Sequence, residues 1–391
     1  MPPVNCSFAE TQPREAGRRL SVAIGLVGVD DLRGEVARML QQTLAYLGHR
    51  SEILRDGDPA AYEYDLLLLP GRCTQFNEFA HLLSRPTPRR PITILWQSEP
   101  LPPPFHSLAT ERLGVQLIDP QWDDVFGWWA RPLNRVLRPR GELTRALRIP
   151  LARRWNCETA KLTEWRWWNI AKQDLALFMR QAAWIRQHAD PRCGWIDEVV
   201  CTKPAGVDYL RHYGIPARFI PMGYHPSWGH NLNLARDVDV LFLGSVRSSG
   251  RRSHVTDALR KLQGRGFRTK IVQKDCFGQE RTELLNRTRI VINLVKYPWE
   301  FPGMRLMMSI GCGAMVVSNE AEINDPYHAE IHYAAADASS LAEVAQHYLD
   351  RESQRVEFAR RALEETNRHL SMELVMARML QPYTSRRANA A

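Results

Sequence analysis

The chain has 391 residues, of which 44% are hydrophobic and 24% are charged, and its formal net charge is +9. This length suits two domains of about 150–200 residues each, and the composition excludes a disordered or fibrous protein. No apolar run approaches the roughly 18 residues that a membrane-spanning helix needs, so the sequence excludes that class as well.

The N-terminus and the cysteines bear on the cellular compartment. The first 20 residues are polar and carry Glu and Arg, which is not typical of a signal peptide, so we expect residues 1–20 to be a disordered lead-in. The seven cysteines form no CxxC pair and no metal-ligand spacing. Scattered thiols without an export signal favour a reducing compartment, and we therefore predict a cytoplasmic protein.

The first half of the chain alternates strand and helix patterns. Residues 21–29 form an apolar run, and residues 32–47 follow with helical spacing. Further strands are predicted at 51–54, 65–69, 91–96, 198–202 and 217–221, with a helical tendency at 75–84 and a helix that runs through Tyr213. Strands that are apolar on both faces and alternate with helices are typical of a parallel sheet covered on both sides.

The same pattern restarts near residue 237. Strands are predicted at 237–244, 269–273, 289–294 and 314–318, and helices at 253–264, 279–287 and 303–311. Two such sets predict an α/β protein with two Rossmann-like doubly wound domains facing a central cleft, and we divide the chain into domains at 21–220 and 221–385. Ligands of such sheets bind outside the carboxyl ends of the strands, so the turns after the strands are the places to expect chemistry.

Residues 120–195 form an insertion in the first domain that is rich in tryptophan and arginine. Two interpretations stay open. Arginines beside interfacial tryptophans could dock the protein peripherally on an anionic membrane, at its inner face. Alternatively, the tryptophans belong to the core and the arginines form a solvated helix face.

The first motif that carries chemistry is the turn after the first strand of the second half. Gly244 lets backbone N–H groups approach a phosphate, and Ser245 leads toward a helix whose N-terminal dipole favours an anion. Arg247 and Arg251 follow and could neutralise a diphosphate through bidentate hydrogen bonds. An ordinary strand-to-helix turn is the alternative interpretation.

The second motif follows the strand at 289–294 and is the more specific of the two. A Pro-Gly pair ending at Gly303 breaks the chain directly before a helix. Lys296 and Arg305 would meet phosphate charge, and Glu300 would accept hydrogen bonds from sugar hydroxyls. For Glu300 alone, a solvated loop acid is the alternative interpretation.

These segments resemble the group 1 glycosyltransferases, in particular the CgeB-like branch named for a spore-maturation protein. The likeness spans residues 236–380 and is carried by the motifs at 240–245, 284–293, 300–305, 311–320 and 349–364. Residues 197–226 are similar to the segment in which the family crosses between its two domains. The likeness covers somewhat more than half of the chain.

The resemblance implies a GT-B fold with a nucleotide-diphosphate sugar bound in the C-terminal domain. It also implies transfer of a hexose with retention of configuration and without an obligatory metal or cofactor. In the wider retaining group, two glutamates with seven residues between them contact the donor sugar and its ribose. Glu300 stands at the first position, whereas Met308 stands at the second and cannot hydrogen-bond a ribose hydroxyl. Glu320 and Glu322 are possible substitutes.

The motifs and the resemblance together define the predicted site. The predicted donor-binding residues are Gly244, Ser245, Arg247, Arg251, Lys274, Lys296, Gly303, Met304, Arg305 and Glu320. For catalysis we predict Glu300 and Glu99, the latter directly after the strand at 91–96. Glu99 would act as a general base or bind an acceptor hydroxyl, and capping of a turn is its alternative role.

Two acidic residues and two glycines favour ordinary roles. Asp237 and Asp239 spell a metal-binding acid pair, but they precede a strand and so lie away from its ligand-facing end. We therefore predict no metal site. Gly25 and Gly28 lack the full GxGxxG pattern, which leaves dinucleotide binding unsupported.

The function predicted from the sequence is transfer of a sugar from a nucleotide-diphosphate donor to an acceptor hydroxyl, on a polysaccharide or a lipid-linked glycan. Two other classes stay open. Met308 favours a non-catalytic GT-B-like module that binds a glycan or a nucleotide sugar. The charge of +9 and the interleaved aromatic residues suggest a nucleic-acid-binding protein, although we expect no nucleic acid as a partner.

Overall fold

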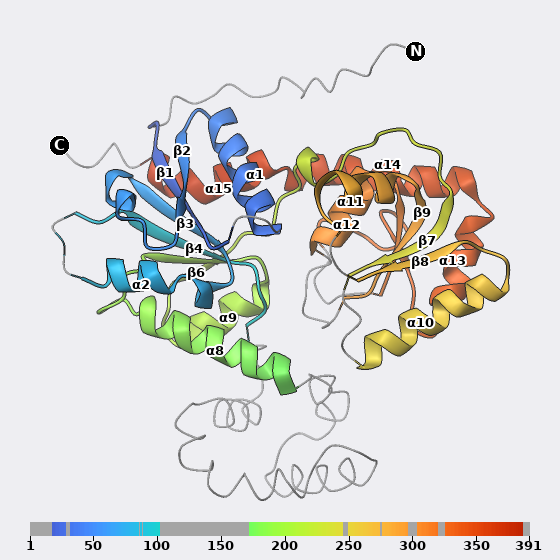
Figure 1. Cartoon of the computed structure of the whole chain (residues 1–391), viewed down its shortest axis with the longest axis horizontal. Helices are drawn as coiled ribbons and strands as arrows, with labels where there is room; N and C mark the ends of the chain where they lie inside the picture. Colours follow the sequence, from blue (N-terminus) through green and yellow to red (C-terminus); the bar gives the residue numbers. More distant parts are fainter. Residues whose placement is uncertain are drawn as a thin grey trace, which may run out of the picture.

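The structure is a computed structural model, and it describes residues 18–28, 32–85, 87, 89–101, 172–244, 249–273, 276–295, 303–319 and 325–385. Two lobes stand side by side, each built around a parallel β-sheet (Figure 1). The predicted α/β class with two Rossmann-like sheets is therefore confirmed. The lead-in before residue 18 and most of the Trp/Arg-rich insertion lie outside the described residues.

The N-terminal sheet has six parallel strands in the order β2-β1-β3-β4-β5-β6. The strands are β1 (Ser21–Leu26), β2 (Arg50–Arg55), β3 (Leu66–Gly71), β4 (Ile92–Gln97), β5 (Glu198–Cys201) and β6 (Ala217–Phe219). The central strands are buried on both faces, whereas β2 at the edge is mostly exposed or half-buried. Apolar runs in the sequence thus mark strands that helices cover on both sides.

Helices cover both faces of this sheet. They are α1 (Leu32–Tyr46), α2 (Asn77–Leu83), α8 (Lys172–His188) and α9 (Pro204–His212), with short 3-10 helices η1 (Pro59–Glu63) and η2 (Cys73–Gln75). Met39 and Leu40 of α1 pack into the core on one face. Phe79 of α2 and Ile185 of α8 belong to the separate core on the other face.

The C-terminal sheet has five parallel strands in the order β11-β10-β9-β7-β8. The strands are β7 (Val238–Leu243), β8 (Thr269–Val272), β9 (Thr288–Asn293), β10 (Met315–Ser318) and β11 (Ala334–Ala335). The sequence analysis predicted the first four and missed β11. Two alanines are too short a run to show any periodicity.

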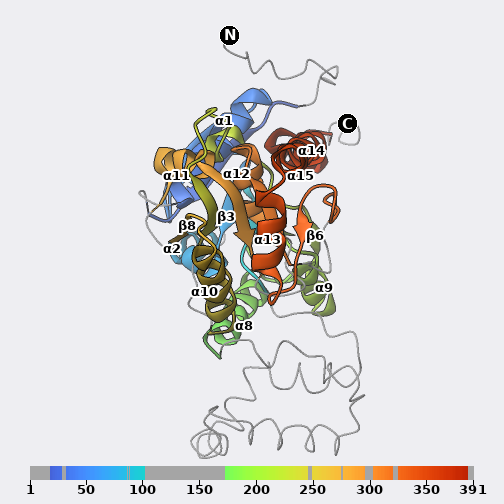
Figure 2. The ribbon, with the colours of Figure 1, turned by 90° about the vertical axis from the view of Figure 1, so that its right-hand side faces the viewer.

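Five helices described in the structure flank the C-terminal sheet. Helices α10 (Ser249–Gly264) and α13 (Leu341–Leu349) lie side by side on one face (Figure 2). Helices α11 (Gly278–Asn286), α12 (Gly303–Gly311) and α14 (Glu352–Leu370) contribute to the core on the opposite face. No helix in the part of the chain that the structure describes combines the length and apolar composition of a membrane span.

The chain crosses between the lobes twice, and the two crossings lie side by side. The Tyr224 N–H donates to the Leu370 carbonyl (2.7 Å), and the Met372 N–H donates to the Tyr224 carbonyl (2.8 Å). The second crossing leads into α15 (Met372–Thr384), which packs against α1 of the N-terminal lobe (Figure 1). The sequence-based division counted this helix with the C-terminal domain, because helical spacing shows a buried face but not its partner.

One apolar core runs from lobe to lobe along the side of the crossings. It joins Met39 of α1 and Met376 of α15 to Met307 of α12. Trp228, in the short 3-10 helix η5 (Pro226–Trp228), is fully buried in this core. The two lobes are therefore held together by packed side chains as well as by the two crossings.

Candidate functional site

The C-terminal sheet has a topological switch point between β7 and β9. After β7 the chain enters α10, which covers one face of the sheet, and after β9 it leads to α12, which covers the other. Where two neighbouring strands send their helices to opposite faces, a crevice opens above their carboxyl ends, and ligands of open α/β sheets bind there. Gly244 follows β7 directly, and Asn293 is the last residue of β9.

Arg305, in the first turn of α12, reaches across both strand ends at this switch point. Its Nε–H donates to the Leu243 carbonyl at the end of β7, and its Nη1–H donates to Oδ1 of Asn293 (3.0 Å). Its guanidinium carbon lies 4.9 Å from the centre of the Phe242 ring. The guanidinium thus has one fixed orientation, with the carbonyl, the amide and the aromatic ring all contacting it.

Gly244 is required at its position by the close approach of Arg305. Its φ of +136° lies in a region that side-chain-bearing residues rarely adopt. A Cβ built there would lie 2.4 Å from Nη2 of Arg305, well inside van der Waals contact. Gly244, which the sequence analysis predicted would let the backbone approach a phosphate, makes room for the guanidinium of Arg305.

Asn293 is held by the neighbouring strand. Its side chain is 2% exposed, and its Nδ2–H donates to Oγ of Ser318 (3.3 Å), the last residue of β10. The Ser318 hydroxyl donates to the Asn293 carbonyl (2.6 Å). Asn319 continues this arrangement, because its Oδ1 accepts from the Val295 N–H (2.7 Å). Three successive parts of the fold, α12, β9 and β10, are thus tied together by polar side chains.

The structure brings together only part of the predicted donor set, because most of its charged members are not described. Gly244, Gly303, Met304 and Arg305 lie at or directly after the switch point. Arg251 lies in α10, and nothing can be said of its side chain. The predicted residues outside the described ranges are Ser245, Arg247, Lys274, Lys296, Glu300 and Glu320.

Met308 is a core residue. Its side chain is 8% exposed and belongs to the apolar core shared by the two lobes, one turn of helix after Arg305. The position at which the resembling family carries a second glutamate therefore serves packing in this chain. A glutamate there would bury a charge among apolar side chains.

The carboxyl edge of the N-terminal sheet carries the predicted residue Glu99. Its side chain is 39% exposed, and Oε1 lies 4.0 Å from Nη2 of Arg72, which follows β3. The neighbouring turn is fixed by Gln97, whose amide donates to the Glu99 carbonyl (3.0 Å) and to Oε1 of Gln181 (2.6 Å). Lys203 donates to the Ser98 carbonyl (2.8 Å). Glu99 thus stands beside Arg72, on a turn that Gln97 and Lys203 hold through hydrogen bonds.

A buried ion pair joins the two lobes at their facing edges. Glu35, in the first turn of α1, accepts from Nη1 of Arg281 in α11 (2.8 Å) and from the Gly278 N–H at the start of that helix. The Arg281 side chain is 2% exposed and that of Glu35 is 15% exposed. Helices that follow parallel strands begin at the carboxyl edge of the sheet, so this contact brings the carboxyl edges of the two sheets toward each other.

The two acidic residues at the start of β7 form ion pairs with arginines. Asp237 pairs with Arg287, and Asp239 pairs with Arg268 (3.4 Å) and Arg289 (3.1 Å), all at the amino edge of the sheet. Burial alone would raise the pKa of Asp239, but the Arg268 N–H and the two guanidinium groups hold it below its ordinary value. Among the residues described, no three His, Cys, Asp or Glu side chains are grouped to hold a metal ion.

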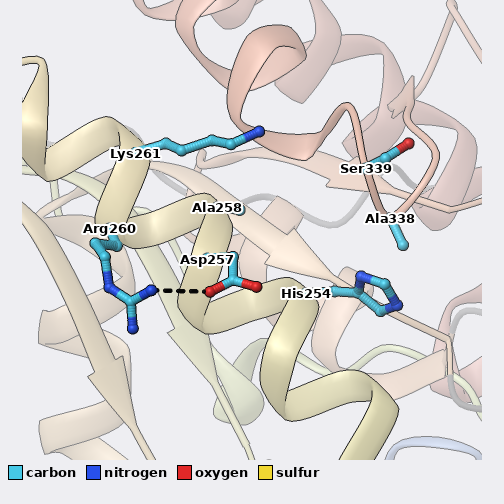
Figure 3. A pocket seen from close by; sticks show the side chains of 7 residues that line it. All are labelled: His254, Asp257, Ala258, Arg260, Lys261, Ala338 and Ser339. Carbon is cyan, nitrogen blue, oxygen red and sulfur yellow. Dashed lines mark hydrogen bonds and ion pairs between the residues drawn. The ribbon is translucent and has the colours of Figure 1, made fainter.

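A separate surface groove of about 470 Å³ lies between α10 and the loop before α13 (Figure 3). Its lining residues are His254, Asp257, Ala258, Arg260, Lys261, Ala338 and Ser339. Arg260 pairs with Asp257 (3.0 Å), and Lys261 pairs with Glu343 (3.5 Å). None of these lining residues belongs to the strand ends at the switch point, so we do not assign the groove to the site.

Comparisons with known proteins agree with the architecture. Residues 249–381, about a third of the chain, match the family model described as "Glycosyl transferase-like". The crystal structure of a glycosyltransferase from Rickettsia africae ESF-5 is similar over 95% of this chain and 100% of its own, with 10% identity and a TM-score of 0.52. The fold is that of a GT-B protein.

A second solved structure is similar over the whole length as well. Anabaena Alr3699/HepE in complex with UDP-glucose matches over 94% of this chain and 100% of its own, with 9% identity and a TM-score of 0.47. A search of curated proteins finds no match. At these identities the likeness to solved structures concerns the fold.

Several residues of the site were missed by sequence reasoning. Asn293 was seen as the end of a strand, and its contact with Arg305 has no local signal except the spacing of twelve residues. Glu35 and Arg281 are separated by 246 residues, so no pattern in the sequence joins them. Gln97 and Gln181 form their contact 84 residues apart. Contacts of this kind depend on the folded arrangement.

Proposed function

We propose that the chain is a glycosyltransferase, which takes a sugar from a nucleotide-diphosphate donor bound above the carboxyl ends of β7 and β9. The observation that carries the proposal is Arg305, which lies at the switch point with its guanidinium fixed over Gly244. A fixed cation at the place where α/β sheets bind ligands suits a diphosphate. The match of residues 249–381 to a glycosyltransferase-like family model supports the same function.

In this proposal the main electrostatic task of the site is to stabilise the negative charge that develops on the departing diphosphate. Arg305 stabilises that charge, together with the predicted residues Arg247 and Lys296. Glu300 orients the donor sugar, and Gly244 and Gly303 allow the backbone to approach the phosphates. Retention of configuration, independence of metal and membership of the CgeB-like branch belong to the proposal and rest on the resemblance of the motifs.

The N-terminal lobe would bind the acceptor. Glu99 stands at the carboxyl edge of its sheet, 4.0 Å from Arg72, and would accept a proton from the acceptor hydroxyl or orient it. We propose a polysaccharide or a lipid-linked glycan as the acceptor, with peripheral contact of the protein with an anionic membrane. A cytoplasmic enzyme at the inner face of the membrane would fit this acceptor.

A second candidate function is favoured by Met308. Because this side chain is buried in the core, it leaves no carboxylate at the position where the resembling family holds the ribose. A GT-B-like module that binds a nucleotide sugar or a glycan without transferring it would tolerate this substitution. The two candidates differ in whether Glu300 and Glu99 are needed for a chemical step.

The experiment that tests the donor site is a thermal-shift screen with UDP, GDP, ADP, CDP and TDP. A ligand that binds only the folded state stabilises it by about 2.7 kcal/mol at a concentration one hundred times its dissociation constant. We expect one nucleotide diphosphate to raise the melting temperature of the wild type and not that of Arg305→Ala. Arg260→Ala, which removes an exposed arginine of the same lobe, is the matched control and should respond like the wild type.

The outcomes separate the candidates. If no nucleotide diphosphate raises the melting temperature of the wild type, the proposed donor site is wrong. If one binds, hydrolysis of the matching nucleotide sugar is measured next for the wild type and for Glu300→Gln. Turnover by the wild type that Glu300→Gln abolishes supports the transferase, whereas binding without turnover supports the module.

A further inference from the structure

Asn293 is hydrogen-bonded to Arg305 at the proposed donor site, and its amide carries no charge. We propose that Asn293 is a positioning residue, which orients the Arg305 guanidinium toward a diphosphate without adding a negative charge beside it. The inference rests on the proposed function, because it concerns the same site. Its basis is the set of hydrogen bonds that joins Arg305, Asn293 and Ser318.

The orientation of the Asn293 amide is determined by its neighbours. Oδ1 accepts from Nη1 of Arg305 (3.0 Å), and Nδ2 donates to Oγ of Ser318 (3.3 Å). A reversed amide would set Nδ2 against the guanidinium, donor against donor. The Ser318 hydroxyl donates its proton to the carbonyl of Asn293 (2.6 Å) or of Asn319 (3.0 Å), so in either case its oxygen is left to accept from Nδ2. The hydrogen bonds therefore run in one direction, from Arg305 through Asn293 to Ser318.

The burial of this set makes it rigid. Asn293 is 2% exposed and Ser318 is fully buried, so neither side chain exchanges its partners with water. Hydrogen bonds in such surroundings strengthen one another, and a partly satisfied set would be costly. A long arginine side chain otherwise loses much rotamer freedom when it binds a ligand. Here that freedom is already lost in the folded protein, before any ligand arrives.

The chemical identity of residue 293 distinguishes a binding role from a purely structural one. A carboxylate at this position would hold Arg305 at least as firmly, through a charge-assisted hydrogen bond. It would also place a negative charge about 3 Å from the guanidinium, which opposes the approach of a diphosphate. The neutral amide fixes the guanidinium and adds no charge. Asn293 can therefore hold Arg305 in place without itself neutralising the charge of the guanidinium.

The test compares Asn293→Asp with the wild type by calorimetric titration of the nucleotide diphosphate identified in the screen. Asparagine and aspartate have nearly the same shape, so the substitution adds a charge and replaces the Nδ2–H donor with an acceptor, toward which the Ser318 hydroxyl can turn. We expect Asn293→Asp to keep or raise the melting temperature and to weaken binding of the nucleotide diphosphate about tenfold or more, because it introduces a like charge beside the phosphates. Binding of the corresponding nucleoside, which has no phosphate, should change much less.

Ser318→Ala is a second variant, which removes the hydroxyl that orients the amide and should weaken binding about threefold through the lost hydrogen bond. It keeps the proposal testable if Asn293→Asp does not fold.

Failure of this inference can be told apart from failure of the proposed function. If the wild type binds a nucleotide diphosphate and Asn293→Asp binds it equally well, Asn293 is structural and the donor site stands. The inference is also overturned if Ser318→Ala binds the nucleotide diphosphate as tightly as the wild type. If the wild type binds none of the five nucleotides, the proposed function is wrong and the inference is overturned with it.

Discussion

The two sheets of the molecule share the same strand order around their switch points, but different side chains stand at their carboxyl edges. The order β2-β1-β3-β4 in the N-terminal sheet corresponds to β8-β7-β9-β10 in the C-terminal sheet. At the C-terminal sheet, a cation lies across the strand ends, on Leu243 and Asn293. At the N-terminal sheet, Gln97 makes hydrogen bonds with the turn that follows its own strand.

This difference separates the position of a site from its chemistry. Topology brings the carboxyl ends of neighbouring strands together in both lobes. The side chains at those ends then decide whether the edge offers charge to a ligand or fixes its own loops. We therefore expect substitutions at the C-terminal edge to change anion binding and a substitution of Gln97 at the N-terminal edge to change stability. Function is a property of the site and not of the fold.

The largest effect is expected for Glu35→Ala, which tests whether the two edges face each other. It leaves Arg281 as a buried charge without its partner from the other lobe, which should cost about 3–5 kcal/mol of unfolding free energy. Urea unfolding of the full chain measures this loss. Arg281→Met in the same chain should restore much of the stability, because it removes the uncompensated charge. A loss below about 1 kcal/mol for Glu35→Ala would argue against a closed contact between the edges.

Gly244→Ala tests the C-terminal edge. The new methyl group would overlap Arg305, and the backbone would keep a strained positive φ, so we expect a loss of about 1–3 kcal/mol. Nucleotide-diphosphate affinity should fall with it, since the guanidinium must move. Gly264→Ala is the control, because no atom lies within 4 Å of its Cβ, and it should be neutral or slightly stabilising. Unchanged nucleotide affinity in Gly244→Ala would contradict the proposed donor site.

Gln97→Leu tests the N-terminal edge and should show the opposite pattern. It leaves the Cys73 N–H and the Gln181 amide without a partner from Gln97, which costs about 1–3 kcal/mol for buried polar groups. Nucleotide-diphosphate affinity should not change, because these groups belong to the other lobe. Gln263→Leu on the exposed side of α10 is the control for the change in polarity. A loss of nucleotide binding in Gln97→Leu would remove the distinction between the two edges.

The smallest effect is expected for Asp239→Asn, at the amino edge of the C-terminal sheet. The pKa of Asp239 in the folded state is lowered, so its stabilising effect is full above the pKa of the unfolded state. It disappears as the pH falls through the folded-state value. Because Arg268 is 58% exposed, we expect only about 1 kcal/mol at pH 7. The difference from the wild type should shrink as the pH is lowered below 3.8, the ordinary pKa of an aspartate, and a difference independent of pH would contradict this account.

Much of the fold follows from local patterns in the sequence. The apolar runs at β1, β3 and β4 are buried on both faces, so their composition alone indicates parallel strands. The alternation with helical spacing in each half predicts two doubly wound sheets. The sequence also placed Gly244 after a strand and Arg305 near the start of a helix, because turn residues and strand ends mark the ligand-facing edge of such a sheet.

The contacts that give the site its geometry could not be predicted in this way. Arg305 was expected to point at a phosphate, but its bonds to Leu243 and Asn293 depend on how α12 returns across the sheet. Met308 was interpreted through a family motif, whereas its burial shows that packing decides this position. The contact of Glu35 with Arg281 depends on how the two lobes meet. Periodicity contains no information on any of these.

The return of α15 to the N-terminal lobe has a consequence for how the protein is made. Residues 225–370, which include the C-terminal lobe, can leave the ribosome and pack before α15 is made. The N-terminal lobe begins first but is finished last, because Val375, Met376 and Met379 complete its apolar core. Until then a nascent chain would expose the face of α1 that α15 covers. The lobe that is translated first therefore depends on α15, which is translated after the C-terminal lobe.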